Sequence, residues 1–263
     1  MRNRFLKHLI FGIFYLIIFS LIGWGIFSLV RPTPSCFDQK LNGTETAIDC
    51  GGSCISCQIK DSSGLKILDQ KIIPSGDNLY TLYFQLANPL SDFGLNDFTY
   101  QIVGFDSVGN EILKQSNQSF IYPQENKYII EPALKTKAPL AAVDIKINNT
   151  QWISKAEFKK PQIQYVNLQT QSQQNFISTS GTLINKESSP FFNTVVVALY
   201  FKSDGTLIGA SRTIVEKLES FSQQDFYLSY PTINADLSQT QIFIYAPRPG
   251  VSGVLYEINP YSR

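Results

Sequence analysis

An uncharged apolar run of 22 residues, LIFGIFYLIIFSLIGWGIFSLV, extends from Leu9 to Val30 near the start of this chain. As an α-helix it would be about 33 Å long, which is enough to cross the hydrocarbon core of a bilayer. Arg2, Arg4 and Lys7 precede the run, and the first 30 residues contain no acidic residue, so the positive-inside rule predicts a cytoplasmic N-terminus. We therefore expect a retained single-pass anchor, with everything after Arg31 outside the cytoplasm.

Two alternatives to a retained anchor fit the sequence less well. A cleaved signal peptide usually has an apolar region of only about 7 to 15 residues followed by an Ala-x-Ala-like site, which this sequence lacks. Lipid attachment at Cys36 would need a different preceding sequence from Thr33-Pro34-Ser35. The anchor reading is therefore preferred.

Charge and composition restrict the exported part further. Three of the 22 basic residues precede the apolar run, so 19 basic and 21 acidic residues follow it, a net charge of −2. This charge balance provides no excess of basic residues with which to bind nucleic acid, so we expect no nucleic-acid partner. The chain is 43% hydrophobic and 16% charged, with 19 Phe and 13 Tyr, which favours folded β-strands over disorder.

All four cysteines lie within the 22 residues CFDQKLNGTETAIDCGGSCISC, at Cys36, Cys50, Cys54 and Cys57. Zinc would call for two paired knuckles or histidine ligands, yet only the last two cysteines have knuckle spacing and the single histidine, His8, precedes the span. In an oxidising compartment an even cluster favours disulfides, here two with three possible pairings. Zinc binding and thiol–disulfide catalysis remain the alternatives.

Hard oxygen ligands lie between these sulfurs, at Asp38, Asn42, Glu45 and Asp49. Carboxylate and amide oxygens suit calcium, and the neighbouring glycines permit the sharp turns that a calcium loop needs. The spacing is not that of an EF-hand. Calcium is therefore the only cofactor for which the sequence offers candidate ligands. The alternative is that these residues cap turns in a loop tied by disulfides.

This segment resembles the short Cys-x-Asp … Asn-Gly-x-Glu-Thr-x-x-Asp-Cys-Gly-Gly-x-Cys-x-x-Cys module found beside membrane anchors or between domains in bacterial surface proteins. The resemblance covers residues 36–57, and Asp38-Gln39 stands where the module usually has Asp-Gly. It implies an exported stalk element and no reaction.

Beyond residue 60 the chain repeats itself at an offset near 96 residues. Such a repeat predicts a duplication, with each half close to the ~100 residues of an immunoglobulin-like sandwich. The matched pairs are LANP at Leu86–Pro89 with LINK at Leu183–Lys186, FDSVGNEI at Phe105–Ile112 with FKSDGTLI at Phe201–Ile208, and DIKI at Asp144–Ile147 with QIFI at Gln241–Ile244.

Within the halves the hydrophobic period is two. The segment NTVVVALYF predicts a strand, and the turn Ser203–Thr206 after it predicts a hairpin that resumes at Leu207. Asn88 and Asn185 are each expected to end an earlier strand before the chain crosses over. The expected strand places on one face Val195, Val197, Leu199 and Phe201.

The second half resembles a FxLYD-type domain, a bacterial extracytoplasmic β-sandwich. The residues that carry the resemblance are GTLINKESSPFFNTVVVALYFKSDGTLIG at Gly181–Gly209 and a later Phe226-Tyr227-Leu228 strand. The family pattern is Gly-x-Val-x-Asn, an apolar strand and a Tyr-Asp-x-x-Gly turn; Phe201-Lys202 replaces Tyr-Asp here. The resemblance implies an exported binding or structural module without a catalytic centre, and it supplies no site residues.

Catalysis is not expected from this sequence. With no histidine after residue 8, the exported part cannot build Ser-His-Asp or Cys-His arrangements. The remaining enzymatic hypothesis is a pair of carboxylates of the kind that glycosidases use, either Asp92 with Asp97 or Glu216 with Glu219. The alternative is that these residues are ordinary solvated surface charges. Trp152, at the end of the first half, is expected to fill the junction between the two halves; the alternative is that it forms a platform on which a ligand stacks.

The predicted fold class is all-β: an N-terminal transmembrane helix, a short Cys-rich module and two tandem immunoglobulin-like β-sandwiches. The function expected is a membrane-anchored, extracytoplasmic, non-catalytic display or interaction module that contacts the lipid bilayer and binds another envelope or surface protein. The alternatives are a carbohydrate- or surface-polymer-binding adhesin and a subunit of a secretion or pilus assembly. The expected segments are a cytoplasmic N-terminus 1–8, a membrane helix 9–30, a linker and disulfide module 31–60, β-sandwich domain 1 at 61–156, β-sandwich domain 2 at 157–250 and a C-terminal tail 251–263.

Overall fold

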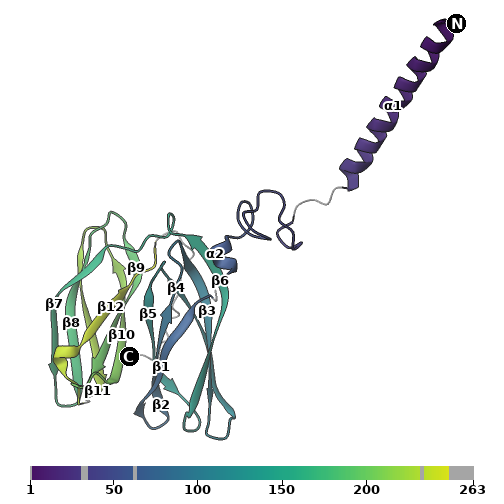
Figure 1. The fold of residues 1–263 in the computed structure, drawn as a ribbon. Helices are drawn as coiled ribbons and strands as arrows, with labels where there is room; N and C mark the ends of the chain where they lie inside the picture. The colour runs from purple at the N-terminus through teal and green to yellow at the C-terminus, as the bar shows by residue number, and fades with distance from the viewer. Residues whose placement is uncertain (1, 31–34, 62–63, 232–233, 249–263) are drawn as a thin grey trace. The chain divides into compact units, whose positions relative to one another are not determined.

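A computed structural model describes residues 2–30, 35–61, 64–231 and 234–248, so the expected tail 251–263 lies outside the described residues. The chain separates into two compact units, Met1–Asp61 and Ser62–Arg263. The first contains helix α1 (Arg2–Val30) and the single-turn helix α2 (Cys57–Lys60) (Figure 1). The stretch His8–Phe27 of α1 has a mean hydropathy of 2.4 and none of it is buried, so α1 is long and apolar enough to cross a membrane.

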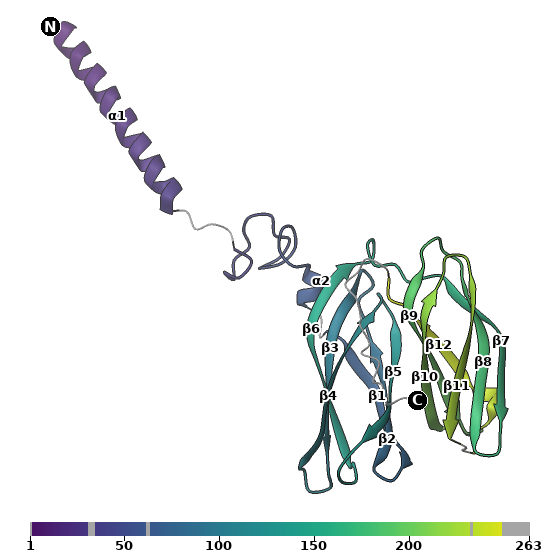
Figure 2. The same cartoon turned by 180° about the vertical axis from the view of Figure 1, so that it is seen from behind.

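The described part of the second unit folds into twelve strands in four three-stranded antiparallel sheets (Figures 1 and 2). The sheet orders are β1-β2-β5 and β4-β3-β6 in the first sandwich, and β7-β8-β11 and β10-β9-β12 in the second. The expected all-β fold of two sandwiches is confirmed. The strands are β1 Lys66–Gly76, β2 Leu79–Ala87, β3 Phe93–Phe105, β4 Glu111–Ile121, β5 Asn126–Lys135, β6 Ala142–Ser154, β7 Ile163–Ser172, β8 Phe176–Asn185, β9 Phe191–Phe201, β10 Leu207–Leu218, β11 Gln223–Pro231 and β12 Gln241–Tyr245, with a 3₁₀ turn, η1, at Leu237–Gln239.

The two sandwiches share one topology, since in each the first, second and fifth strands form one sheet and the third, fourth and sixth form the other. The hairpin turns also match. The Asp106 N–H donates to the Asn110 carbonyl in one, and the Lys202 N–H donates to the Thr206 carbonyl in the other. Each turn contains a glycine with positive φ, 88° in the first and 82° in the second, where other residues would be strained.

A buried asparagine fixes the crossover in each sandwich. The side-chain amide of Asn88 donates to the carbonyls of Phe93 and Tyr122 at 2.8 and 2.9 Å. The amide of Asn185 donates to the carbonyls of Ser189 and Glu219, both at 2.8 Å. Asn88 and Asn185 are only 3% and 1% exposed, so each satisfies buried backbone groups that a loop would otherwise leave unpaired.

The central strands β2 and β9 are buried on both faces. One face of β2 contributes Leu82, Phe84 and Leu86 to the core of the first sandwich, while Tyr83 points the other way and joins the cluster of the second. In β9, Val195–Tyr200 are all buried. A continuous apolar run such as that of β9 is typical of strands covered on both sides.

The sheet β1-β2-β5 packs against the sheet β10-β9-β12, which explains this double burial. Ile73, Tyr83 and Ile130 of the first sandwich belong to one hydrophobic cluster with the residues of β9, β10 and β12. Polar contacts cross the same interface, including one from Lys71 Nζ to the Leu207 carbonyl at 2.6 Å. Since large apolar interfaces suppress motion between domains, we treat the two sandwiches as one block, here called the sandwich pair.

The linker between the sandwiches is sealed by Phe158 rather than by Trp152. Phe158 is 1% exposed and stacks on Tyr122 with ring centroids 4.3 Å apart. Trp152 instead packs on the core of the first sandwich, where it pairs with Leu95 of β3. The expectation that Trp152 fills the junction was therefore wrong, because β6 continues through this residue and turns its side chain toward its own sandwich.

Candidate functional site

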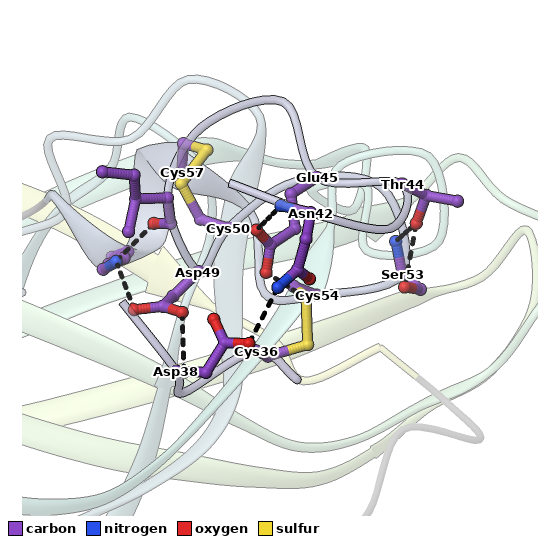
Figure 3. The surroundings of a disulfide bond; sticks show 12 residues. Cys36, Asp38, Asn42, Thr44, Glu45, Asp49, Cys50, Ser53, Cys54 and Cys57 are labelled. Atoms are coloured by element: carbon purple, nitrogen blue, oxygen red, sulfur yellow. Dashed lines mark hydrogen bonds and ion pairs between the residues drawn. A yellow bond between two sulfur atoms is a disulfide. The ribbon is translucent and has the colours of Figure 1, made fainter. Parts of the chain in front are cut away.

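The four cysteines form two crossed disulfides, Cys36–Cys54 and Cys50–Cys57 (Figure 3). The expectation of two disulfides is confirmed, and the structure selects one of the three possible pairings. We call residues 36–61 the cystine module. Because each bridge joins one cysteine inside the other bridge's loop to one outside it, the two loops overlap and share residues 50–54.

The Gly51–Gly52 turn makes this pairing possible. Both residues have positive φ, 81° and 58°. A Cβ at position 52 would lie 2.0 Å from the Thr44 carbonyl oxygen, and one at position 51 would lie 1.9 Å from the Thr46 hydroxyl. Only glycine therefore allows the chain to turn here and bring Cys54 and Cys57 back toward their partners.

The four expected calcium ligands lie in one hydrogen-bonded network (Figure 3). The Asp49 carboxylate accepts the N–H groups of residues 38 and 39, and the Glu45 carboxylate accepts the Asn42 N–H. Asp38 accepts the Asn42 side-chain amide at 2.8 Å, which lowers the pKa of Asp38. These carboxylates thus hold turns of the loop, as the capping alternative expected; calcium binding stays a prediction, and titrating the oxidised protein with calcium chloride tests it.

A zinc site at these cysteines does not fit the structure. Cys36, Cys54 and Glu45 bring their donor atoms within 4.8 Å of one another, but both sulfurs are joined in a disulfide. A disulfide sulfur is not the thiolate that zinc requires. The cystine module is therefore a structural cross-link rather than a thiolate metal site.

A buried lysine lies where the two sandwiches meet. Lys127 of β5 is 1% exposed; its Nζ donates to the Phe120 carbonyl at 2.7 Å and lies 3.4 Å from the centroid of the Phe120 ring. Tyr245 of the second sandwich covers it, with its ring centroid 5.0 Å from Nζ. Burial lowers the pKa of Lys127 to about 7; the nearby Glu125 carboxylate opposes this shift and Lys160 adds to it.

A second polar group crosses the same interface. Glu131 of β5 is 2% exposed; it accepts the Tyr100 hydroxyl from its own sandwich, and Arg212 of β10 lies 3.5 Å away in the other. Because a buried carboxylate is costly without partners, this pairing favours one registration of the two sandwiches. Sequence reasoning missed both this group and Lys127, although the uninterrupted apolar run of β9 signalled an interface there.

A groove opens between the free edges of β7 and β12 in the second sandwich. Within the described strands, β7 pairs only with β8 and β12 pairs only with β9, so both edges carry unpaired backbone groups. The groove has a volume of about 440 Å³, and Tyr165, which is 41% exposed, lies in it. Its lining consists of Asn126, Lys160, Ile163, Gln164, Tyr165, Ile242, Phe243, Ile244 and Tyr245.

The carboxylates weighed for catalysis lie in separate settings. Asp92 is exposed and accepts the Ser91 hydroxyl. Asp97 is partly buried at an irregular position of β3, and this burial raises the pKa of Asp97. Glu219 pairs with Lys217 at 2.6 Å, and Glu216 is exposed on β10.

Comparisons with known proteins do not assign this chain to a family. No family model matches it, and no curated protein matches it in sequence. A matching solved structure is the crystal structure of red sea bream transglutaminase, with a TM-score of 0.23 and 8% identity, covering 71% of this chain and 32% of that one. The chain thus spans about a third of the length of that protein, and a match at this level carries no argument.

Proposed function

We propose that this chain is a non-catalytic interaction module of a bacterial envelope, anchored by α1 in the cytoplasmic membrane, with its N-terminus inside and the sandwich pair outside. The observation that carries this proposal is the oxidation of all four cysteines immediately after an apolar helix. Disulfides persist in oxidising compartments and are rare in the cytoplasm. The three basic residues before the helix favour the same orientation.

Labelling with a membrane-impermeant maleimide tests the orientation. Val108 is 80% exposed at a hairpin turn of the first sandwich, so Val108→Cys should react in intact spheroplasts. The matched variant, Asn3→Cys, should react only after permeabilisation. The native cysteines contribute no background because the described chain contains no free thiol. Labelling of Asn3→Cys but not Val108→Cys in intact spheroplasts would refute the proposed topology.

Binding of another envelope or surface protein is proposed to use the groove between β7 and β12. An extended segment of the partner would add as a strand to these free edges, with main-chain hydrogen bonds giving affinity. The exposed Tyr165 and the half-buried Ile163 would contact alternate side chains of that segment. We also propose that the second half belongs to the FxLYD-type family and that residues 36–57 form a stalk element of the kind found in bacterial surface proteins. Both proposals agree with a role in binding rather than catalysis.

Site-specific photo-crosslinking in intact cells tests the groove. A photoreactive residue in place of Tyr165 should capture one envelope protein, whereas the same residue at Val108, which is exposed and does not line the groove, should not. Capture at both positions, or at position 108 alone, would contradict the assignment of the groove.

A carbohydrate-binding adhesin is the alternative that one observation favours. The outward face of β7-β8-β11 carries amide and hydroxyl side chains, such as Gln169 and Thr182, beside Tyr227, which is 54% exposed. These groups suit hydrogen bonding and stacking with sugars. Loss of surface-polymer binding in Tyr227→Ala, with the fold intact, would favour this alternative over the groove.

A further inference from the structure

The cystine module exposes the large apolar side chains that its sequence contains. Phe37 is 90% exposed, Leu41 62%, Ile48 52% and Ile55 49%. In the described residues of the module, the only buried apolar side chain is that of Cys50, at 2%. The disulfides hold the module without a hydrophobic core, so these side chains remain available for contact with something else.

Phe37 and Leu41 flank one tight turn. Gln39, between them, has a positive φ of 59°, and the Asp49 carboxylate accepts the N–H groups of both Asp38 and Gln39 at 3.0 Å. The polar atoms of this turn are thereby satisfied on the inside of the module. Its two apolar side chains, by contrast, are left with most of their surface outside.

The length of chain between α1 and this turn limits where the turn can lie. α1 ends at Val30 and the module begins at Cys36, so six Cα–Cα steps separate them, at most about 22 Å when fully extended. If α1 spans a bilayer, this tether keeps the turn near the membrane surface. Such a short tether also gives the two side chains a high local concentration at the interface.

The charges of the module do not prevent a contact with lipid. Residues 36–61 contain two basic and four acidic side chains, a net charge of −2, so anionic headgroups would not attract the module. Several of these charges are used internally: Asp49 lies 3.8 Å from Lys60, and Glu45 accepts the Asn42 N–H. Burial of apolar surface is then the driving force that remains.

We propose that the cystine module lies in the outer interface of the membrane that α1 crosses, with Phe37 and Leu41 inserted at the boundary between headgroups and acyl chains. This inference rests on the proposed anchoring by α1. The module then acts as a stop at the membrane surface, where the exported chain leaves the bilayer, in addition to serving as a covalent staple.

Depth-dependent fluorescence quenching of full-length protein in phosphatidylcholine vesicles with brominated acyl chains tests the proposal. The two native tryptophans, Trp24 and Trp152, are replaced by Phe, and Phe37→Trp is introduced as the reporter. We expect its emission to shift to the blue and to be quenched several times more strongly than that of the matched variant, Val108→Trp, on the sandwich pair. Leu41→Trp serves as a second reporter if Phe37→Trp disturbs disulfide formation.

A separate variant distinguishes this inference from the anchoring on which it rests. With Trp152→Phe alone, the native Trp24 of α1 is the only reporter, and its quenching measures insertion of the helix. Quenching of Trp24 together with equal, weak quenching of Phe37→Trp, Leu41→Trp and Val108→Trp would overturn the interfacial position while leaving the anchor intact. Failure to quench Trp24 would overturn the anchor itself.

Discussion

The cystine module and the sandwich pair are stable for opposite reasons. The module has two disulfides in 22 residues and leaves Phe37, Leu41, Ile48 and Ile55 exposed. The described part of the sandwich pair contains no cysteine, and its central strands β2 and β9 are buried on both faces. Covalent cross-links therefore replace burial in one region, and burial makes cross-links unnecessary in the other.

This difference has a consequence for how each region responds to stress. A domain with a core loses structure cooperatively when its packing is disturbed. A very small module without a core is stable only because its disulfides restrict the unfolded chain. Reducing agents should thus act on the module alone, and packing or charge changes at the sandwich interface should act on the pair alone.

Reduction is expected to have the largest effect. The two bridges close loops with sequence separations of 18 and 7. The entropy that these loops remove from the unfolded chain corresponds to a stabilisation of about 3 and about 2.5 kcal/mol respectively. With no buried apolar side chain except Cys50 to compensate, the reduced module should unfold completely. Hydrogen exchange of residues 36–61 in oxidised and reduced full-length protein should show loss of protection there.

The sandwich pair supplies the internal control for this experiment. Its thermal unfolding midpoint should be the same with and without reductant, because it contains no cysteine. A reductant-dependent midpoint would mean that the module and the pair stabilise each other, and the contrast drawn between them would fail.

Arg212→Ala should produce the next largest effect, confined to the pair. Removing the guanidinium leaves the Glu131 carboxylate buried at the interface beside the Tyr100 hydroxyl but without the positive charge of Arg212, which should destabilise the protein by about 3 to 5 kcal/mol. Urea unfolding of full-length protein in detergent micelles measures the change.

A double variant separates charge burial from lost packing. Glu131→Gln removes the buried charge, so adding it to Arg212→Ala should recover a large part of the lost stability. If the double variant is no more stable than Arg212→Ala, the Glu131 charge is not the reason for the loss.

Lys127 should make the stability of the pair depend on pH. Its folded-state pKa of about 7 lies below the ordinary value of about 10.4, so between these values the unfolded chain binds a proton that the folded chain does not. Stability therefore rises as pH increases from 7, by about 2 to 3 kcal/mol up to pH 9. Below pH 7 the lysine is protonated in both states and its contribution is constant.

Lys127→Met is the matched variant for this titration. Methionine fills a similar volume between the rings of Phe120 and Tyr245 without a charge, so the variant should be more stable at pH 7 and nearly independent of pH up to 9. Above pH 10 the buried tyrosines complicate the comparison, because burial raises the pKa of Tyr122 and Tyr245. An unchanged pH profile in Lys127→Met would exclude this lysine as its source.

The features of the fold that sequence predicts best are those carried by local pattern. Alternation and turn residues predicted the hairpin after β9, and the clustered cysteines predicted two disulfides. Their pairing was not predictable, because it depends on the path that the Gly51–Gly52 turn gives to the chain. Residue spacing alone contains no such information.

The packing of one sandwich on the other was missed for a different reason. The hydrophobic alternation of β9 predicts one apolar face that carries Val195, Val197 and Leu199. It does not account for the residues between them, which are also apolar. Lys127 was still harder to find, since its sequence context is that of a surface lysine. Its burial is set by Phe120 from another strand and Tyr245 from the other sandwich.

The two crossover asparagines provide the smallest and most even effect. Asn88→Ala and Asn185→Ala each leave two backbone carbonyls without their donor in a buried corner, so each should destabilise the pair by about 2 kcal/mol. Asn148→Ala, on an exposed position of β6, is the control and should change little. Equal losses measured by urea unfolding would show that the duplicated corner does the same work in both sandwiches. A loss of stability in only one of the two variants would contradict this equivalence. It would mean that packing between the two sandwiches compensates for the lost hydrogen bonds in the other variant.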